Sequence, residues 1–309
     1  FGERGSLRTE NDQTSVNVLV YGQADVQLSD HFALIAGGQG LWAMRDNDAI
    51  FNDTSGDVDF SQFNPRVGIL WDIVENIQGF LNVNRSFEPP SMADLTAGGA
   101  FAFTPLDSQE AWTVEFGNRG RNHYFAWDFA IYRSWVDNEL LDFGAPGARG
   151  FVSFTANADN SIHQGIELGM DWFMFSHRLR KHGIQLTWRH VLTANDFYFD
   201  ADQTYGNNAL AGVPDIVYVT ELKLTHTQGW YITLNSRWVP NGPYADFANT
   251  TRVPGYDLWA FNLGWTVSPA LELYVSAENI FGKHYISNVR TNANQRVENG
   301  RLFTPGQGA

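Results

Sequence analysis

The feature that most constrains this chain is a regular alternation of apolar and polar residues, repeated along most of its length. The segments 112–117 (WTVEFG) and 125–131 (FAWDFAI) show it most clearly, because every second residue is aromatic or aliphatic and the residues between include Glu115 and Asp128. A period of two predicts β-strands with one apolar and one polar face. Aromatic-rich strands of this kind occur in soluble sandwiches, where the apolar face meets a second sheet, and in transmembrane barrels, where it meets lipid.

Composition removes several classes of protein. The chain has 309 residues, a formal charge of -14 and no cysteine, and its mean hydropathy is -0.28. No apolar run approaches the roughly 18 residues of a membrane helix, but a barrel needs apolar residues only at every second position. The missing cysteines exclude disulfides, thiolate metal sites and cysteine nucleophiles. The acidic balance argues against a nucleic-acid partner, which would require a basic surface.

The alternation predicts an all-β chain of about 12 strands, with boundaries uncertain by about two to four residues. We expect the strands near 12–28, 32–47, 63–73, 77–87, 109–118, 124–143, 161–176, 183–199, 214–227, 229–240, 256–267 and 271–286.

The connections between these strands alternate in length. Short turns are expected at 29–31, 74–76, 119–123, 177–182, 228–229 and 268–270, and long segments at 48–62, 88–108, 144–160, 200–213, 241–255 and 287–301. A soluble sandwich has no reason to place all its long loops at one end. An outer-membrane barrel has short periplasmic turns and long extracellular loops, so the pattern favours an antiparallel, up-and-down transmembrane barrel.

Charged residues on the polar face support the barrel. An unpaired carboxylate in a dry core would cost several kcal/mol, so the polar face is expected to be hydrated or to pack on a polar plug. We predict that Glu115, Asp128, Glu167 and Asp171 point into the lumen, with Trp127, Phe129 and Leu168 pointing outward. The alternative is a soluble core capped by aromatic residues.

Several motifs together resemble the barrel of TonB-dependent outer-membrane receptors. Each motif is weak, but all keep the order and spacing of that family. They are NPRVGILWDI from Asn64, LNVNRSFEPPSMADL from Leu81, LDSQEAWTVEFG from Leu106, YRSWVDNELLDF from Tyr132, Asn157 with HQGIELGMDW from His163, LYVSAENIFGKHY from Leu273 and FTPGQGA from Phe303.

The resemblance implies a function as well as a fold. It implies a bacterial outer-membrane receptor that actively takes up a large, scarce nutrient, most often a ferric siderophore, without covalent chemistry or a resident cofactor. The implied partners are that ligand, a TonB-type energy-coupling protein acting through a plug domain, and outer-membrane lipid and lipopolysaccharide. Alternatives are a receptor for cobalamin, another organic cofactor or a glycan, a passive channel, and a barrel enzyme.

The chain departs from the family pattern in two respects. It contains no plug domain or energy-coupling box, and it stops at Ala309, where a closing strand should begin. We therefore expect residues 1–309 to be the C-terminal portion of a barrel of about 22 strands, with the strand near 12–28 unpaired along one edge. Pairing of that strand with the strand near 271–286 would instead favour a small passive channel.

The candidate ligand-binding residues are aromatic and cationic side chains on the long loops. Bulky anionic chelates bind through aromatic stacking and arginine contacts. The candidates are Phe101, Phe103, Arg149, Tyr205, Tyr244, Arg252 and Arg290.

We predict neither a catalytic nor a metal site. No serine, histidine and carboxylate have a spacing that singles out a triad. His177 and His182 are separated by Arg178, Arg180 and Lys181, whose charge opposes a cation. The acidic runs at 46–59 and 196–202 do not form a glycine-punctuated loop of the EF-hand kind and are interpreted as a solvated rim.

Overall fold

A computed structural model of the chain describes residues 10–50, 54–96, 103–147, 150–294 and 303–306. Most of these residues form one antiparallel sheet of 12 strands. In the order of the sheet the strands are β1 (Asn11–Gln27), β2 (Phe32–Ala49), β3 (Gly56–Val74), β4 (Ile77–Glu88), β5 (Gln109–Arg121), β6 (Phe125–Asp137), β9 (Asn160–Met174), β10 (Ile184–Phe199), β11 (Ile216–His226), β12 (Trp230–Val239), β13 (Tyr256–Ser268) and β14 (Leu271–Ala277). The predicted up-and-down antiparallel fold is confirmed.

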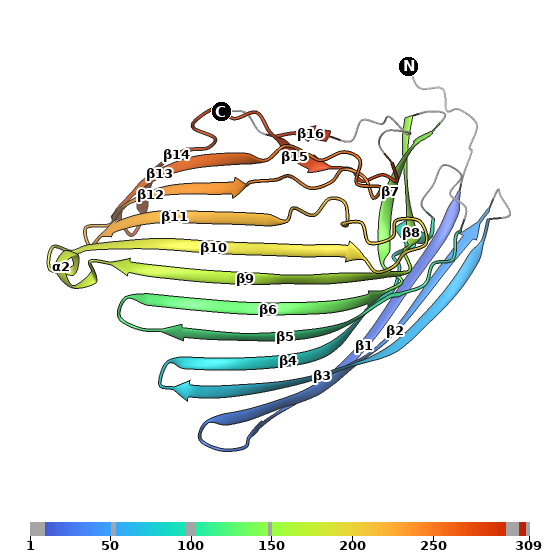
Figure 1. Cartoon of the computed structure of the whole chain (residues 1–309), viewed down its shortest axis with the longest axis horizontal. Coiled ribbons are helices and arrows are strands. Elements are labelled where there is room, and N and C mark those ends of the chain that lie inside the picture. Colours follow the sequence, from blue (N-terminus) through green and yellow to red (C-terminus); the bar gives the residue numbers. More distant parts are fainter. Residues whose placement is uncertain (1–9, 51–53, 97–102, 148–149, 295–302, 307–309) are drawn as a thin grey trace.

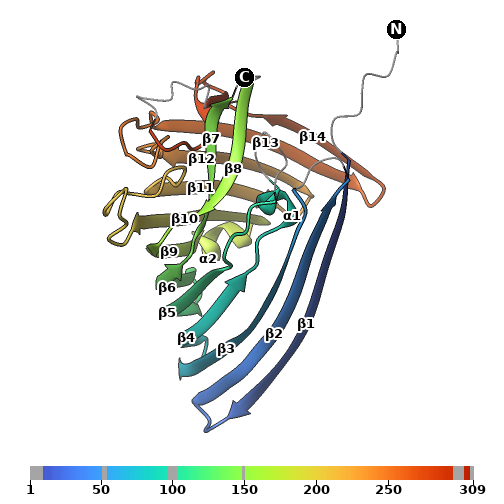
Figure 2. The same cartoon turned by 90° about the vertical axis from the view of Figure 1, so that its right-hand side faces the viewer.

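The strands lie side by side, and their connections differ at the two ends of the sheet (Figure 1). At one end, called the turn end below, neighbouring strands are joined by short connections such as 28–31 and 75–76. At the other end, the loop end, most connections are long, and one carries the strands β7 and β8. The predicted long segment 48–62 is an exception: β3 starts at Gly56 rather than near residue 63, so the β2–β3 connection is only 50–55. Viewed from the loop end, the sheet curves into an open trough (Figure 2). The alternation of connection lengths therefore has the expected consequence, with all long connections on one side.

The strand register places the charged residues on one face. Glu115 is paired with Tyr132, and Glu167 is paired with Ala130. Directly paired residues share a face of an antiparallel sheet, and residues two apart along a strand do so as well. Glu115, Asp128, Glu167 and Asp171 consequently share one face, and Trp127, Phe129 and Leu168 lie on the other.

The polar face is the concave one. The strand pairings from β2 to β5 place Arg45 on the same face as Glu115. Arg45 Nε donates a hydrogen bond of 3.0 Å to the carbonyl of Pro90. Pro90 precedes the short helix α1 (Met92–Leu95), which lies inside the curve of the sheet (Figure 2). The carboxylates therefore face the lumen, as predicted.

The convex face is apolar and carries aromatic residues near both ends of the strands. Such belts lie at the two membrane–water interfaces of transmembrane barrels. The turn-end aromatic row contains Trp71, Trp127, Trp172, Trp230 and Trp265, and the loop-end row contains Trp42, Trp112, Trp135, Trp238 and Trp259. Between the two rows this face is mostly apolar and suited to contact with lipid, whereas toward the loop end it also carries the Arg85–Glu110 ion pair and Arg133, which donates to Gln164.

The sheet is open at both edges. Within the described residues, β1 pairs only with β2 and β14 pairs only with β13. The sheet thus does not close between its first and last strands, in agreement with the expected free edge of the first strand.

The predicted strand 124–143 is two strands, which corrects the expected boundary. β6 ends at Asp137, and Asn138 has a left-handed conformation with φ 54°. Asn residues tolerate this conformation and commonly end regular structure. The chain then forms a separate hairpin of β7 (Leu140–Gly147) and β8 (Gly150–Asn157), so the predicted long loop 144–160 is partly a strand pair.

The strand expected near 271–286 is also shorter than predicted. β14 ends at Ala277, and Asn279 (φ 47°) and Gly282 (φ 62°) then form a turn. The short strands β15 (Ile286–Val289) and β16 (Phe303–Pro305) pair with each other beyond it.

Helices are few and short. Besides α1, the described residues form α2 (Ser176–Arg180) between β9 and β10. Neither helix has the length and apolarity needed to cross a membrane.

Candidate functional site

The connections at the loop end have an apolar core of their own. Phe199, Leu210, Ala211 and Phe247 are buried against one another, although they come from β10 and from two different connections. Leu141, Phe143, Ala158, Phe197 and Tyr205 pack around them. The connections 200–213 and 241–255 and the hairpin β7–β8 therefore form one packed unit, called the loop cluster below.

Aromatic contacts hold the centre of the loop cluster together. Phe247 is 1% exposed. Its ring centroid lies 4.9 Å from that of Phe143 and 5.7 Å from that of Phe199. Tyr205 lies 5.0 Å from Phe199 and 5.9 Å from Phe247. Tyr205, predicted to contact ligand, thus packs against the end of β10 and against the β12–β13 connection.

Hydrogen bonds join the same connections to one another. The Asn249 side chain accepts from Ala209 N at 2.8 Å and donates to Ala209 O at 2.9 Å. Asn208 Nδ2 donates to Phe247 O at 2.9 Å. The hydroxyl of Thr291 donates to Asp142 O at 2.6 Å, which attaches the segment after β15 to the hairpin. The surface of the loop cluster is consequently built on several connections that position one another.

Arg252 and Tyr244 lie together at the edge of this unit. The guanidinium of Arg252 lies 5.0 Å from the centroid of the Tyr244 ring. Its Nε donates to Gly242 O at 3.0 Å, and its Nη2 forms an ion pair with Asp215. The sequence analysis did not single out Asp215, because one aspartate beside Pro214 carries no signal of its partner. Arg252 therefore has one acidic partner within the protein, and its side chain remains partly exposed.

The remaining predicted ligand residues have different surroundings. Phe103 donates its backbone N–H to Thr54 O at 3.3 Å, and its ring lies over Gly56. Arg290 is exposed. Phe101 and Arg149 lie outside the described residues. The structure thus brings Tyr244 and Arg252 together, whereas Phe103 packs on the β2–β3 connection.

The β4–β5 connection is attached to the lumen wall by Arg45, which the sequence analysis also missed. Arg45 is 5% exposed, although no carboxylate pairs with it in the described part of the chain. Besides Pro90 O, its guanidinium donates to Asn17 Oδ1 at 2.9 Å and to Met44 O at 2.9 Å. The buried Arg45 guanidinium therefore holds the β4–β5 connection, which contains α1, against β1 and β2.

We expect replacement of Arg45 by methionine to release this connection. Unsatisfied buried acceptors cost about 1–3 kcal/mol, so the segment around α1 should become more accessible to protease in folded protein. Limited proteolysis checks this, and Arg66→Met, an exposed arginine on the same lumen wall, is the matched control. Equal cleavage of the two variants would contradict the attachment.

A buried polar cluster near the loop end resembles a catalytic triad only in composition. Ser161 donates to one carboxylate oxygen of Glu139, and His163 Nε2 lies 3.1 Å from the other. A triad needs the serine and the carboxylate on opposite nitrogens of the imidazole. Here the same nitrogen, His163 Nε2, faces both Glu139 and Ser161 Oγ, the latter at 3.4 Å. Ser161 is also fully buried. The arrangement joins the start of β7 to β9 and has no accessible nucleophile.

No group of three or more histidine or carboxylate side chains in the described ranges is arranged to hold a metal ion.

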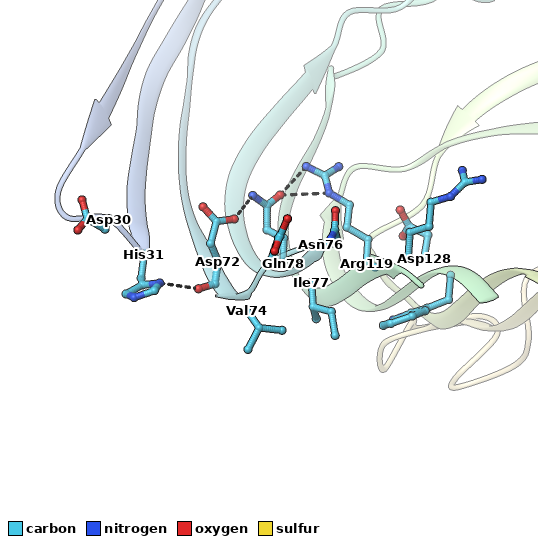
Figure 3. A pocket seen from close by; sticks show the side chains of 13 residues that line it. Asp30, His31, Asp72, Val74, Asn76, Ile77, Gln78, Arg119 and Asp128 are labelled. Atoms are coloured by element: carbon cyan, nitrogen blue, oxygen red, sulfur yellow. Dashed lines mark hydrogen bonds between the residues drawn. The ribbon is translucent and has the colours of Figure 1, made fainter. Parts of the chain in front are cut away.

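A charged recess lies at the turn end, where the lumen wall meets the edge of the sheet (Figure 3). It has a volume of about 750 Å³ and is lined by residues of the first turn and of β3 to β6. Gln78 lies at its centre, donating to Asp72 Oδ1 at 2.8 Å and accepting from Arg119 Nη2 at 2.7 Å. Asp171 and Arg189 form a second, bidentate contact on the same face, at 2.7 and 3.0 Å. Opposite charges fixed along this wall can orient polar groups in the lumen.

A family of known proteins matches nearly the whole chain. The sequence model described as "TonB dependent receptor-like, beta-barrel" matches residues 2–280.

Solved structures with the same fold agree with this match, although their sequences are distant. The copper transporter OprC has a TM-score of 0.76 at 14% identity, and the match covers 96% of this chain and 47% of OprC. The ferric yersiniabactin uptake receptor FyuA from Yersinia pestis has a TM-score of 0.75 at 16% identity, covering 97% and 45%. The ferric citrate transporter FecA in its unliganded form has a TM-score of 0.73 at 15% identity, covering 97% and 44%. The chain therefore spans less than half the length of each of these structures.

Proposed function

Because the chain belongs to the TonB-dependent receptor β-barrel family, we propose that it forms part of an outer-membrane receptor for active uptake of a ferric siderophore. The family is an outer-membrane one, and its solved relatives include proteins named as uptake receptors and transporters. The observation that carries the proposal is the division of the molecule into a packed loop cluster and a polar lumen wall.

The mechanism divides between these two parts. The loop cluster and the cations beside it bind the ligand from outside, and the polar wall provides the path inward. A plug domain, moved by a TonB-type protein in the periplasm, opens this path, and no bond of the ligand is broken.

The proposal also requires further strands beside β1 and β14. Unpaired backbone N–H and C=O groups in lipid cost several kcal/mol each, so open sheet edges do not occur there. We place the plug and the additional strands in other parts of the receptor, with residues 1–309 as the C-terminal portion of its barrel.

Binding should depend on the cations at the loop end. Replacing Arg252 by alanine should weaken binding of an anionic ferric chelate by about 1.5–3 kcal/mol, the contribution of a hydrogen bond to a charged group. This corresponds to more than tenfold in the dissociation constant, measured by titration with ferric citrate and with ferric catecholate and hydroxamate siderophores. Arg149 and Arg290, together with Phe101, Phe103, Tyr205 and Tyr244, are the further proposed ligand residues.

Two control variants separate a ligand contact from a structural role. Asp215→Asn removes the ion-pair partner and leaves Arg252 in place. If Arg252 contacts the chelate, this variant retains binding, whereas a structural role would make it as weak as Arg252→Ala. Lys223→Ala removes a cation from the lumen side of β11 and should bind normally. Unchanged affinity in Arg252→Ala would show that Arg252 is not part of the binding site.

Uptake tests the function as a whole. A strain lacking the receptor should fail to accumulate radiolabelled iron from its chelate, and uptake should also stop without the energy-coupling protein. Uptake of cobalamin, copper or an oligosaccharide instead would support the function as an uptake receptor but contradict the ferric siderophore as its ligand. Diffusion that continues without energy coupling would identify a passive channel.

A further inference from the structure

The connection between β9 and β10 is a basic protrusion at the turn end (Figure 1). It reads HRLRKH from His177 to His182, and Arg178, Arg180 and Lys181 are all exposed. The chain as a whole has a formal charge of -14, although the adjacent β5–β6 turn also follows two cations, Arg119 and Arg121, at the end of β5. The acidic turn residues Asp30 and Glu75 lie further along the sheet, in the β1–β2 and β3–β4 turns. We call residues 177–182 the basic turn, because it concentrates positive charge on an otherwise acidic protein.

The backbone holds these cations in a defined structure. Phe175 adopts φ 51°, and its carbonyl accepts from the N–H groups of Arg178 and Leu179, both at 3.0 Å. The turn ends with His182 N donating to Leu179 O at 2.9 Å, followed by Gly183 at φ 73°. The cations therefore project from an ordered helical turn.

The cations of the basic turn form no ion pair with any residue that the structure describes. None of the ion pairs formed by the described residues includes Arg178, Arg180 or Lys181. Phe175, at the start of the turn, is 62% exposed. An apolar side chain beside unpaired cations is a common composition of segments that lie at a membrane surface.

The position of the basic turn relative to the aromatic row indicates what lies next to it. Trp172 on β9 and Trp188 on β10 flank the turn on the convex face, with ring centroids 6.1 Å apart. Phe125 continues the stack at 6.0 Å from Trp172. Aromatic side chains of such belts lie at the level of the lipid headgroups. The basic turn follows this row directly along the chain and is thus placed beside the headgroups.

We propose that the basic turn binds the phosphate groups of anionic phospholipids in the leaflet at the turn end of the barrel. This inference rests on the proposed location in a membrane. Arginine donates paired hydrogen bonds to phosphate, and lysine contributes a point charge. Each cation near an anionic surface favours association by about fivefold, so together they should select anionic over zwitterionic lipid.

The absence of cysteine allows a direct test. In a receptor whose parts outside residues 1–309 are also made free of cysteine, a His182→Cys substitution gives one labelling site, at an exposed position in the turn. The labelled receptor is reconstituted in bilayers of phosphatidylcholine and phosphatidylglycerol. Fluorescence quenching by brominated phosphatidylglycerol, relative to brominated phosphatidylcholine, then measures which lipid lies beside the turn.

We expect phosphatidylglycerol to be preferred by fivefold or more, and this preference to disappear when Arg178, Arg180 and Lys181 are all replaced by glutamine. Arg290→Gln, which removes an exposed cation after β15, should leave the preference unchanged. A label with no lipid preference, or a preference that survives the triple substitution, would overturn the proposal. So would cosedimentation with purified peptidoglycan that depends on these cations in the absence of any lipid preference.

A separate readout distinguishes failure of this inference from failure of the proposed function. Folded barrels inserted in a bilayer migrate differently from heat-unfolded protein in gels. A receptor that inserts without lipid selectivity refutes only the role of the basic turn, whereas one that does not insert refutes the membrane location.

Discussion

Replacing Ile166 by arginine should destabilise the folded receptor by about 2–4 kcal/mol, the cost of a cation on the lipid face near the bilayer midplane. Ile166 lies in the middle of β9, paired with Ile131 and Ala194, and is 44% exposed on the convex face. An arginine there must extend toward the headgroups or bring water into the bilayer. The free energy of unfolding in urea, from phospholipid vesicles, measures this effect.

The matched control places the same side chain one residue further along β9. Glu167 points to the lumen, so Glu167→Arg should fold and insert with a much smaller loss of stability. The comparison tests the strand register, because a shift of one residue would exchange the faces of the two positions. A larger destabilisation by Glu167→Arg than by Ile166→Arg would show that the charged face is not the lumen.

Replacing Phe247 by alanine should disrupt the loop cluster. Phe-to-Ala substitutions at buried positions cost about 3–5 kcal/mol, and Phe247 contacts Phe143, Phe199 and Tyr205 from three separate parts of the chain. We expect the backbone bond from Phe247 N to Asn292 O to lose protection in hydrogen exchange. Ligand affinity should fall as well, although Phe247 is too deeply buried to touch a ligand.

Phe154→Ala is the control for this experiment. Phe154 stacks on Phe143 at 5.5 Å, but it is 39% exposed and lies outside the buried core of the cluster. It should therefore lose less protection and less affinity than Phe247→Ala. If Phe247→Ala exposes only its own connection and leaves the others protected, the connections are independent loops, and the concept of one packed unit is wrong.

Ile166→Arg and Phe247→Ala should destabilise different parts of the molecule. Ile166→Arg affects the contact between sheet and lipid and should lower the stability of the whole barrel. Phe247→Ala affects a core outside the sheet and should leave the strands intact. If Ile166→Arg impairs membrane insertion while Phe247→Ala impairs only ligand binding, the contributions of the sheet and of the loop cluster are separated experimentally.

The sequence by itself determined the sheet and its faces. An alternation with period two fixes which residues share a face, and the position of Glu115 or Leu168 then follows from counting. The order of short and long connections likewise determined which end carries the loops. Both signals are local along the chain, and backbone pairing between sequential strands preserves them.

Only the tertiary structure decided the organisation of the candidate site. Phe143, Phe199 and Phe247 are far apart in the sequence, and no local pattern predicts that they meet. The pairing of Arg252 with Asp215, and the attachment of Pro90 by Arg45, are also long-range contacts. Loop conformations depend on such contacts, because irregular backbone has no repeating hydrogen-bond pattern to specify it. The ends of the strands depended on single residues such as Asn138, whose left-handed conformation the apolar pattern does not reveal.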